Sequence, residues 1–278
     1  MNGNSEVDSL ASSIAARINA AARELAAQWV HPQGTATRHF VLDDLLPAQS
    51  VARIYASFPR TGAAWYQRQS FRERKKTFAK LDAVDPLIGA ITDAFHKPEV
   101  LQAVRAVTGI EGLEADPELY AGGISMMGQG DFLNPHIDNS HDARRERYRR
   151  LNLLYYISPD WMPGNGGNLE LWDAAVTVPK TLHSKYNRLV VMQTDRWSWH
   201  SVSPIVVSQD RCCVSNYYFS RTSPEQRDYY HVTSFIGRPE QTALRLWGRI
   251  DNLARQCVAM LTGKSRGKSL SRGANAQR

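Results

Sequence analysis

The sequence predicts an α+β protein whose core is mainly β, a double-sheet jelly roll with helices at both ends of the chain. From about residue 118 onward, short apolar runs are bounded by Gly, Pro, Asn and Asp, which is the pattern of a β-rich core. On either side of this region, apolar residues recur at helical spacing instead. The number and spacing of the β-like runs are typical of a jelly roll. The expected strands cover residues 119–127, 132–138, 151–158, 168–172, 188–193, 200–207 and 211–220.

The N-terminal region is predicted to be mostly helical. Residues 6–30 form an amphipathic pattern, which we expect to pack as one helix against the core. Its apolar positions are Leu10, Ile14, Ile18, Leu25 and Trp29. A short strand is expected at 38–42, followed by helices near 48–58, 85–96 and 98–108, the last of which should end at Gly109.

The C-terminal region predicts one more helix and then a basic tail. Pro239 is expected to open the helix and Gly263 to end it. The apolar residues that share one face of this helix are Leu244, Trp247, Ile250, Ala254, Cys257 and Leu261. We therefore divide the chain into an N-terminal helix (1–30), a main domain (31–222, with its core at about 118–222), a helical extension (223–263) and a basic tail (264–278) that we expect to be disordered.

Composition excludes several classes of protein. The hydrophobic share of 42% rules out a chain too polar to build a core. The tail carries five of the seven net positive charges, so the rest of the chain is close to neutral and nucleic acid is not an expected partner. The cysteines Cys212, Cys213 and Cys257 form no disulfide framework, which favours a reducing, cytoplasmic setting. We expect no targeting segment and no membrane span.

A metal site is predicted at His136-Ile137-Asp138. Positions i and i+2 of a strand project from the same face, so the imidazole and the carboxylate can converge on one ion. Two histidines and one carboxylate form the facial triad that holds non-haem Fe(II) and leaves coordination positions open. We expect the second histidine to be His200, which lies 64 residues after His136 at the head of an apolar strand.

Arg211 predicts a binding site for an anion beside this metal. It follows His200 by 11 residues and opens the next expected strand. A lone charge at the start of such an apolar run is costly to bury unless it is paired. Its guanidinium group would suit the distal carboxylate of a dicarboxylate co-substrate.

Further features follow the same order along the chain as in a known family. A glycine and an aromatic residue precede the His-x-Asp pair. A Tyr-rich strand and a Gly-Gly turn follow it, and after them come the distal histidine and then a basic residue. With these features, residues 118–222 resemble the prolyl 4-hydroxylase-like branch of the 2-oxoglutarate/Fe(II)-dependent dioxygenase superfamily. The residues concerned are Gly130-Asp131-Phe132, His136-Ile137-Asp138, Leu153-Leu154-Tyr155-Tyr156-Ile157, Gly166-Gly167, His200 and Arg211.

The resemblance implies a double-stranded β-helix in which His136, Asp138 and His200 bind Fe(II). Arg211 would then grip the distal carboxylate of 2-oxoglutarate. Tyr156 matches a strand tyrosine that often hydrogen-bonds the same carboxylate. The implied cofactors are therefore Fe(II) and 2-oxoglutarate as co-substrate, with ascorbate as the expected reductant.

Two positions depart from the family. Many relatives carry a tyrosine nine residues before the first ligand, where this chain has Met127, so we leave that contact unassigned. The nucleic-acid demethylases carry a second arginine six residues after the first, where this chain has Tyr217. Repair of DNA or RNA is correspondingly less expected.

The implied activity is hydroxylation of an unactivated C–H bond, with release of succinate and CO2. Asp138 fills the iron position that related halogenating enzymes leave to chloride, which favours hydroxylation, while desaturation and cyclisation stay open. The substrate, a small molecule or a peptidyl side chain, and the oligomeric state are not identified by the sequence.

Two alternative functions remain at this point. A cupin-type metalloenzyme that does not use 2-oxoglutarate would explain the triad but leaves Arg211 and Tyr156 without a role. A catalytically silent binding module would have no chemical need for three metal ligands.

A basic run between two expected strands also has two interpretations. It could receive an anionic substrate at the mouth of the site, or form a solvated, salt-bridged face because acidic residues are interleaved with it. We favour the salt-bridged face. The run and its acids are Arg144, Arg145, Arg147, Arg149 and Arg150 with Asp142 and Glu146.

Overall fold

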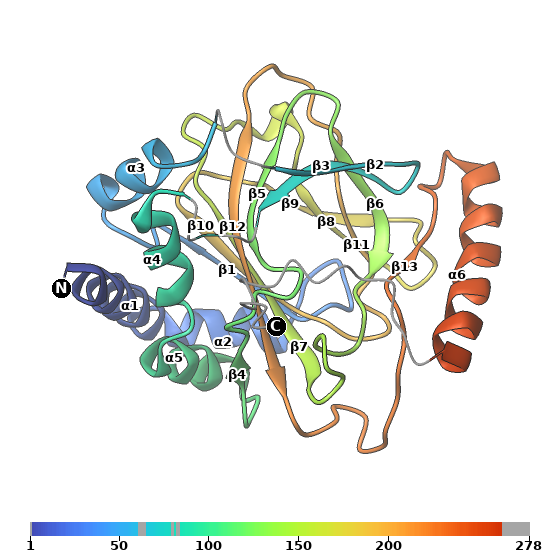
Figure 1. Cartoon of the computed structure of the whole chain (residues 1–278), viewed down its shortest axis with the longest axis horizontal. Helices are drawn as coiled ribbons and strands as arrows, with labels where there is room; N and C mark the ends of the chain where they lie inside the picture. The colour runs from blue at the N-terminus through green and yellow to red at the C-terminus, as the bar shows by residue number, and fades with distance from the viewer. Residues whose placement is uncertain (1, 61–64, 79–80, 82–83, 263–278) are drawn as a thin grey trace, which may run out of the picture.

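Strands rich in β-branched and aromatic residues form the centre of the molecule, and helices cover it on two opposite sides (Figure 1). The computed structural model describes residues 2–60, 65–78, 81 and 84–262. Every strand pairing in these residues is antiparallel. The strands are β1 (His39–Asp43), β2 (Tyr66–Gln69), β3 (Glu73–Phe78), β4 (Glu114–Ala115), β5 (Gly123–Met127), β6 (Phe132–Ile137), β7 (Tyr148–Tyr156), β8 (Leu169–Trp172), β9 (Pro179–Leu182), β10 (Arg188–Gln193), β11 (His200–Val202), β12 (Arg211–Ser220) and β13 (Ser234–Phe235).

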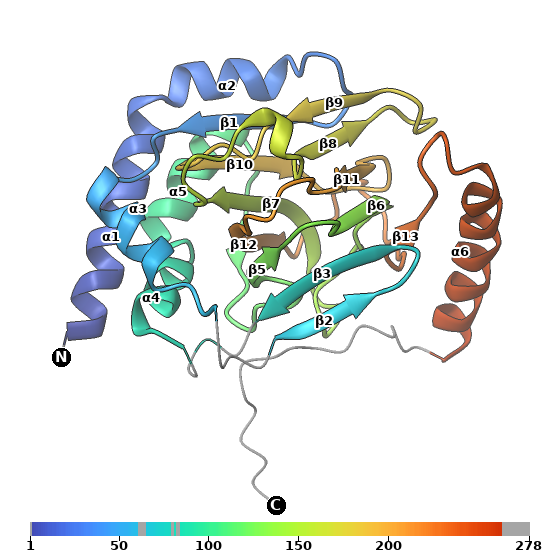
Figure 2. The ribbon, with the colours of Figure 1, turned by 90° about the horizontal axis from the view of Figure 1, so that it is seen from above.

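The strands form one 13-stranded sheet that curls over on itself (Figure 2). Its order is β1-β10-β7-β12-β5-β3-β6-β11-β8-β9. In addition, β2 pairs with β3, β4 pairs with β12, and β13 pairs with β6. β3 connects the two halves because it pairs with both β5 and β6. The halves face each other across a cavity lined from β6, β7, β8, β11 and β12. This architecture confirms the predicted jelly roll, with its two sheets continuous at β3.

The helices on the N-terminal side cover the outer face of the curled sheet. α1 packs against α4 and α5, and α2 packs against β1 and α5. All five apolar positions predicted from the N-terminal pattern are buried. These helices are α1 (Asn2–Ala20), α2 (Ala22–Val30), α3 (Ala48–Ala56), α4 (Pro86–Ala94) and α5 (Pro98–Thr108).

Alternation along β7 shows how the sheet separates core from cavity. Leu151, Leu153 and Tyr155 are buried against the helices in the main apolar core. Asn152 and Tyr156, on the other face, line the cavity. Because side chains alternate along a strand, one set packs in the apolar core and stabilises the fold, while the other set lines the cavity.

Several boundaries differ from the predictions. The single helix expected over 6–30 is two helices, separated at Ala21, where the backbone leaves helical geometry (φ −103°, ψ 5°) without a Gly or Pro to mark the break. The first expected strand begins at Gly123 rather than residue 119, because Leu119 and Ala121 have positive φ angles. β11 ends at Val202, two residues before Pro204, which lacks the N–H that would continue the ladder.

The C-terminal helix α6 (Thr242–Thr262) lies on the opposite side of the sheet from α1–α5, beside β13 (Figures 1 and 2). It begins three residues after Pro239, following a turn in which Gln241 N–H donates to the carbonyl of Arg238. The predicted stop at Gly263 and the tail 264–278 fall outside the described residues. The division of the chain into domains at residues 30, 222 and 263 stays a prediction.

Helix length and hydropathy bear on membrane insertion. In the part of the chain that the structure describes, no helix combines the length and the apolar character required to cross a bilayer.

The burial of α2 generates a stability prediction. Trp29 is 1% exposed and meets Phe40 edge to face, with ring centroids 6.4 Å apart. Trp29→Ala should lower the free energy of unfolding by about 3–5 kcal/mol, because it removes a large buried side chain and leaves a cavity. Denaturant unfolding measures this loss. The neighbouring Val30 is 57% exposed, so Val30→Ala should stay within about 0.5 kcal/mol of the wild type. Equal stability of all three proteins would contradict this account of the packing.

Candidate active site

Three side chains with metal-binding atoms meet at one end of the cavity. Strand register places His200 of β11 directly opposite His136 of β6, and Asp138 follows the last residue of β6. Asp138 Oδ1 lies 3.8 Å from His136 Nε2, and Asp138 Oδ2 lies 3.8 Å from His200 Nε2. One donor atom from each residue lies within 4.8 Å of the others. The structure thus brings together the three residues that the sequence singles out.

Backbone contacts fix how the two imidazole rings present their nitrogens. His136 Nδ1 lies 3.0 Å from the carbonyl oxygen of Asn134, and His200 Nδ1 lies 2.9 Å from that of Ser198. Because a carbonyl oxygen only accepts, each Nδ1 carries the hydrogen and each Nε2 offers a lone pair toward Asp138. The ring of Phe235 stacks on His136 with a centroid distance of 5.0 Å, which holds that ring in place.

The protonation states also suit a metal centre. Burial lowers the pKa of His136 to about 3, with a further contribution from His200, so the ring is neutral. Burial of Asp138 disfavours its charge, but the positive charge of Arg149, with smaller contributions from His200 and His136, outweighs burial and lowers the pKa of Asp138 to about 2. Asp138 Oδ2 is buried, and no hydrogen-bond donor reaches it from the part of the chain that the structure describes. A divalent cation between the two imidazoles and this carboxylate would satisfy that oxygen.

Arg211 and Tyr156 lie in the same cavity as the triad. Arg211 is 4% exposed, and its Nη atoms contact the carbonyl oxygen of Gly167 (2.9 Å) and the sulfur of Met127 (3.2 Å) rather than a carboxylate. Its Nε and the hydroxyl of Tyr156 are buried and have no hydrogen-bond partner among the described residues. Burial raises the pKa of Tyr156, so the hydroxyl remains a donor. A carboxylate between Arg211 and Tyr156 would satisfy both groups.

The Gly-Gly turn supports Arg211 by close approach of its backbone. Gly167 has a φ of +66°, and a Cβ there would lie 3.0 Å from Arg211 Cδ. The carbonyl of Gly167 accepts from both Arg211 and Ser184. A larger residue would therefore strain the turn and displace the guanidinium group.

The cavity is large enough for a co-substrate and part of a second molecule. Its volume is about 730 Å³. It extends from the triad past β2 and β3 to the inner side of α6. This size lies within the roughly 300–1,000 Å³ range of small-molecule sites.

Arg149 is the residue of the site that the sequence interpretation missed. Its side chain is 1% exposed, its Nη1 lies 3.7 Å from Asp138 Oδ2, and its guanidinium group stacks on Tyr217 at 3.9 Å. A register shift between Tyr218 and Phe219, opposite this part of β7, accompanies the inward position of Arg149. No sequence pattern signals such an irregularity.

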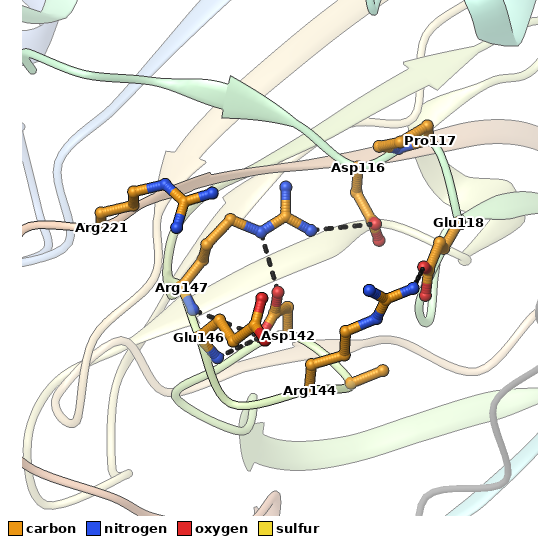
Figure 3. A pocket seen from close by; sticks show the side chains of 9 residues that line it. Asp116, Pro117, Glu118, Asp142, Arg144, Glu146, Arg147 and Arg221 are labelled. Atoms are coloured by element: carbon orange, nitrogen blue, oxygen red, sulfur yellow. Dashed lines mark hydrogen bonds and ion pairs between the residues drawn. The ribbon is translucent and has the colours of Figure 1, made fainter.

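The salt-bridged interpretation of the basic run holds for Arg144 and Arg147 but was wrong for Arg149. Arg145 and Arg150 instead donate to the hydroxyl groups of Tyr230 and Ser220. Figure 3 shows Arg147 between Asp142 and Asp116, and Arg144 beside Glu118. Arg147 Nε donates to Asp142 at 2.8 Å. These residues form a salt-bridge network at a separate, small pocket, not part of the cavity that holds the triad.

Comparisons with known proteins agree with this geometry. Residues 122–219 match the family model described as "2OG-Fe(II) oxygenase superfamily". A comparison with curated protein sequences finds no match. The matched segment contains all five residues predicted for the site.

Solved structures with a similar fold include hydroxylases. A prolyl 4-hydroxylase from Phytophthora capsici has 20% identity and a TM-score of 0.55, covering 90% of this chain and 77% of its own. A prolyl hydroxylase from Trichoplax adhaerens, solved with a peptide fragment of the hypoxia inducible factor oxygen degradation domain, has 16% identity and a TM-score of 0.54, covering 76% and 94%. The non-haem alpha ketoglutarate dependent epimerase SnoN from nogalamycin biosynthesis has 13% identity and a TM-score of 0.51, covering 80% and 87%.

Fold, site and family match together define the class of protein, a non-haem oxygenase that depends on Fe(II) and 2-oxoglutarate. Residues 122–219, which contain the β5–β12 core, are similar to the 2OG-Fe(II) oxygenase superfamily. Its fold is the one shared by the prolyl 4-hydroxylase-like branch, as the sequence resemblance implied. The cupin-type and silent-module alternatives are not favoured.

The triad geometry generates a metal-binding prediction. His200→Ala should weaken Fe(II) binding by more than the roughly 10–100-fold that loss of an outer partner costs, because it removes one of three donor atoms. Anaerobic calorimetric titration with Fe(II) measures the change. His183→Ala is the control, since His183 is exposed and lies outside the cavity. Wild-type affinity in His200→Ala would place the metal elsewhere.

Proposed function

We propose that this protein hydroxylates an unactivated C–H bond of a small-molecule or peptidyl substrate, using Fe(II) held by His136, Asp138 and His200. One molecule each of substrate, dioxygen and 2-oxoglutarate would give hydroxylated product, succinate and CO2. Decarboxylation of 2-oxoglutarate supplies two electrons and the C–H bond supplies two, which together reduce dioxygen. Bound iron would supply the activation of dioxygen, and ascorbate would keep the iron ferrous.

The protein's own residues would position the reactants. Arg211 would bind the distal carboxylate of 2-oxoglutarate bidentately, and Tyr156 would donate a hydrogen bond to the same group. Arg149 would hold the Asp138 carboxylate in position through its charge. The near-complete burial of these groups would exclude bulk water from the reacting atoms.

One observation carries this proposal: Arg211 is a buried cation whose contacts in the described residues include no carboxylate, and it opens onto the same cavity as the triad. A metalloenzyme with no anionic co-substrate would have no use for such a charge. The outcome of hydroxylation, rather than halogenation, is supported by Asp138, whose carboxylate occupies the place that chloride would need. We also propose the cytoplasm as its compartment, where the free Cys212, Cys213 and Cys257 would remain reduced.

The proposed anchor generates a co-substrate prediction. Arg211→Ala should weaken 2-oxoglutarate binding by about 2–5 kcal/mol, because a charge-assisted pair in a buried site is lost. Fe(II) affinity should change little. Calorimetry with Mn(II) in place of Fe(II) measures both affinities without turnover, and succinate formed in the absence of substrate measures activity.

Two further variants keep this test informative if Arg211→Ala folds poorly. Arg211→Lys retains the charge without the bidentate geometry and should have intermediate affinity. Tyr156→Phe removes one neutral donor and should cost only about 0.5–1.5 kcal/mol. Unchanged affinity for 2-oxoglutarate in Arg211→Lys and Arg211→Ala would assign the anchor to another residue.

Charges at the mouth of the cavity favour an anionic group on the substrate. Glu73 is shared by Arg68 Nη1 at 3.0 Å and Lys75 Nζ at 3.2 Å. One carboxylate therefore faces two cations, and within residues 2–60, 65–78, 81 and 84–262 the buried Arg68 Nε has no hydrogen-bond partner. All three residues line the cavity.

A second cluster at the mouth of the cavity also has two cations for one carboxylate. Asp251 of α6 is shared by Arg72 Nη2 at 2.6 Å and Arg255 Nη1 at 3.9 Å. Burial, followed by the charge of Arg72, lowers the pKa of Arg255, so the protein alone does not fully compensate this pair. We infer that the substrate presents a carboxylate, phosphate or sulfate to this cluster.

This inference generates a substrate prediction. In a screen of compound pairs that differ only in an acidic group, the anionic member should stimulate succinate formation above the uncoupled rate. Arg255→Gln should raise the KM of that compound by roughly tenfold, since a charged contact is lost. Arg144→Gln, which breaks a surface ion pair outside the cavity, is the matched control. A neutral compound that stimulates equally in the wild type and Arg255→Gln would contradict the inference.

A further inference from the structure

The helix α6 turns large apolar side chains away from the protein. Leu246, Trp247, Ile250 and Leu253 are 64%, 65%, 53% and 69% exposed. These four residues, which we call the α6 apolar face, lie within eight consecutive positions of one helix. Both views place α6 at the edge of the molecule, away from the other helices (Figures 1 and 2).

Polar side chains on the inner side of α6 fix this orientation. Asn252 donates to the carbonyl of Phe235 (2.8 Å) and accepts from its N–H (3.0 Å). Gln256 accepts from Val232 N–H (3.2 Å) and donates to the carbonyl of Tyr230 (3.0 Å). The two amides thus connect α6 to the backbone of β13 and of the segment that precedes it.

Two more contacts hold α6 close to the body. Arg245 donates to the carbonyls of Ala175 and Val176, each at 2.9 Å. A Cβ at Gly248 would lie 2.7 Å from the carbonyl oxygen of Phe235, so only glycine permits this approach. Rotating α6 to bury its apolar face would break these contacts, and the outward apolar face is therefore part of the folded structure.

The net charge of the chain is concentrated in the C-terminal part of the sequence, from α6 onward. Residues 242–278 contain eight basic residues and one acid, a net charge of +7, which equals the net charge of the whole chain. Residues 1–241 are therefore electrically balanced. The basic residues are Arg245, Arg249, Arg255, Lys264, Arg266, Lys268, Arg272 and Arg278, and the acid is Asp251.

Other occupants of the α6 apolar face fit these observations less well. A second copy of the chain would bring two ends of the same positive charge together. Nucleic acid would use the basic residues but would leave Leu246, Ile250 and Leu253 without a role. Residues 264–278 contain Leu270 as their single large apolar residue, so their composition does not suit them to cover the face.

We propose that the α6 apolar face docks on the surface of an anionic lipid bilayer. An amphipathic helix with bulky apolar residues and basic neighbours binds in the interface of such a bilayer, with its apolar side among the acyl chains and its cations near the headgroups. The helix lies on the membrane without crossing it. This proposal does not rest on the proposed catalytic activity, because it uses only exposed side chains and charge.

Vesicle sedimentation with the full chain tests the proposal. The protein should sediment with vesicles of phosphatidylcholine mixed with phosphatidylglycerol, sediment much less with phosphatidylcholine alone, and dissociate as salt is raised. Trp247→Glu should weaken binding to the anionic vesicles by about tenfold or more, because it replaces an inserted apolar ring by a like charge. Truncation after Gly263 should also weaken it, while uncoupled succinate formation stays at the wild-type rate.

The control is Trp197→Glu. Trp197 is 64% exposed, nearly the same as Trp247, but lies in the turn before β11. Trp197→Glu should bind vesicles like the wild type. Three results would overturn the proposal: no sedimentation with anionic vesicles, equal losses in Trp197→Glu and Trp247→Glu, or a dimer in sedimentation equilibrium that Trp247→Glu dissociates.

Discussion

The pairing of β6 with β11 is the constraint on which the rest of the site depends. It joins segments more than sixty residues apart in sequence and sets His200 opposite His136. A slip of one residue would turn every side chain of β11 to the other face, so the register is also what decides whether a metal centre exists. Val202 of β11 pairs with Leu133 of β6, and the packing of these two residues in a local apolar cluster helps to hold this register.

Buried charge is the second determinant of the site. Arg149 and Arg211 are both almost completely buried, and each points at a place where negative charge is needed. Arg149 faces the Asp138 carboxylate, whereas Arg211 donates hydrogen bonds, among the residues that the structure describes, to a carbonyl and a thioether. Burying an unpaired cation is costly. A bound dicarboxylate would offset that cost, so 2-oxoglutarate should stabilise the fold as well as serve the reaction.

The sequence predicts most of the architecture because the central strands carry strong patterns. Seven of the expected strands lie within a few residues of their predicted positions, and the three residues of the triad are recognisable from i, i+2 spacing and order along the chain. The hairpin of β2 and β3 was missed because its residues, Tyr66–Gln69 and Glu73–Phe78, are polar and show no alternation. Strand pairing with β5 and β6, a tertiary effect, determines it.

For both Arg149 and α6, the sequence pattern does not predict which side chains face the interior of the protein. A run of arginines is typical of a solvated face, and only the irregular pairing of β7 with β12 turns one of them inward. In α6 the predicted apolar face shares Trp247 and Ile250 with the exposed apolar face, whereas Leu246 and Leu253 were not assigned to it, and periodicity alone does not say which face meets the protein. Here the amides of Asn252 and Gln256 decide, because satisfying backbone groups of the neighbouring strand outweighs burial of the apolar side.

The two sides of α6 connect the proposed docking surface with the proposed substrate site. Asp251 and Arg255 line the cavity mouth from the inner side, while Trp247 and Ile250 point outward. An α-helix with its side chains is roughly 10–12 Å across, so a bilayer in contact with the outer side would lie about that far from the cationic mouth. That distance is short enough for an anionic headgroup, displaced slightly from the bilayer, to reach the cavity. An anionic lipid or lipid-linked substrate would therefore account for both features of one helix, the excess of cations inside and the apolar face outside.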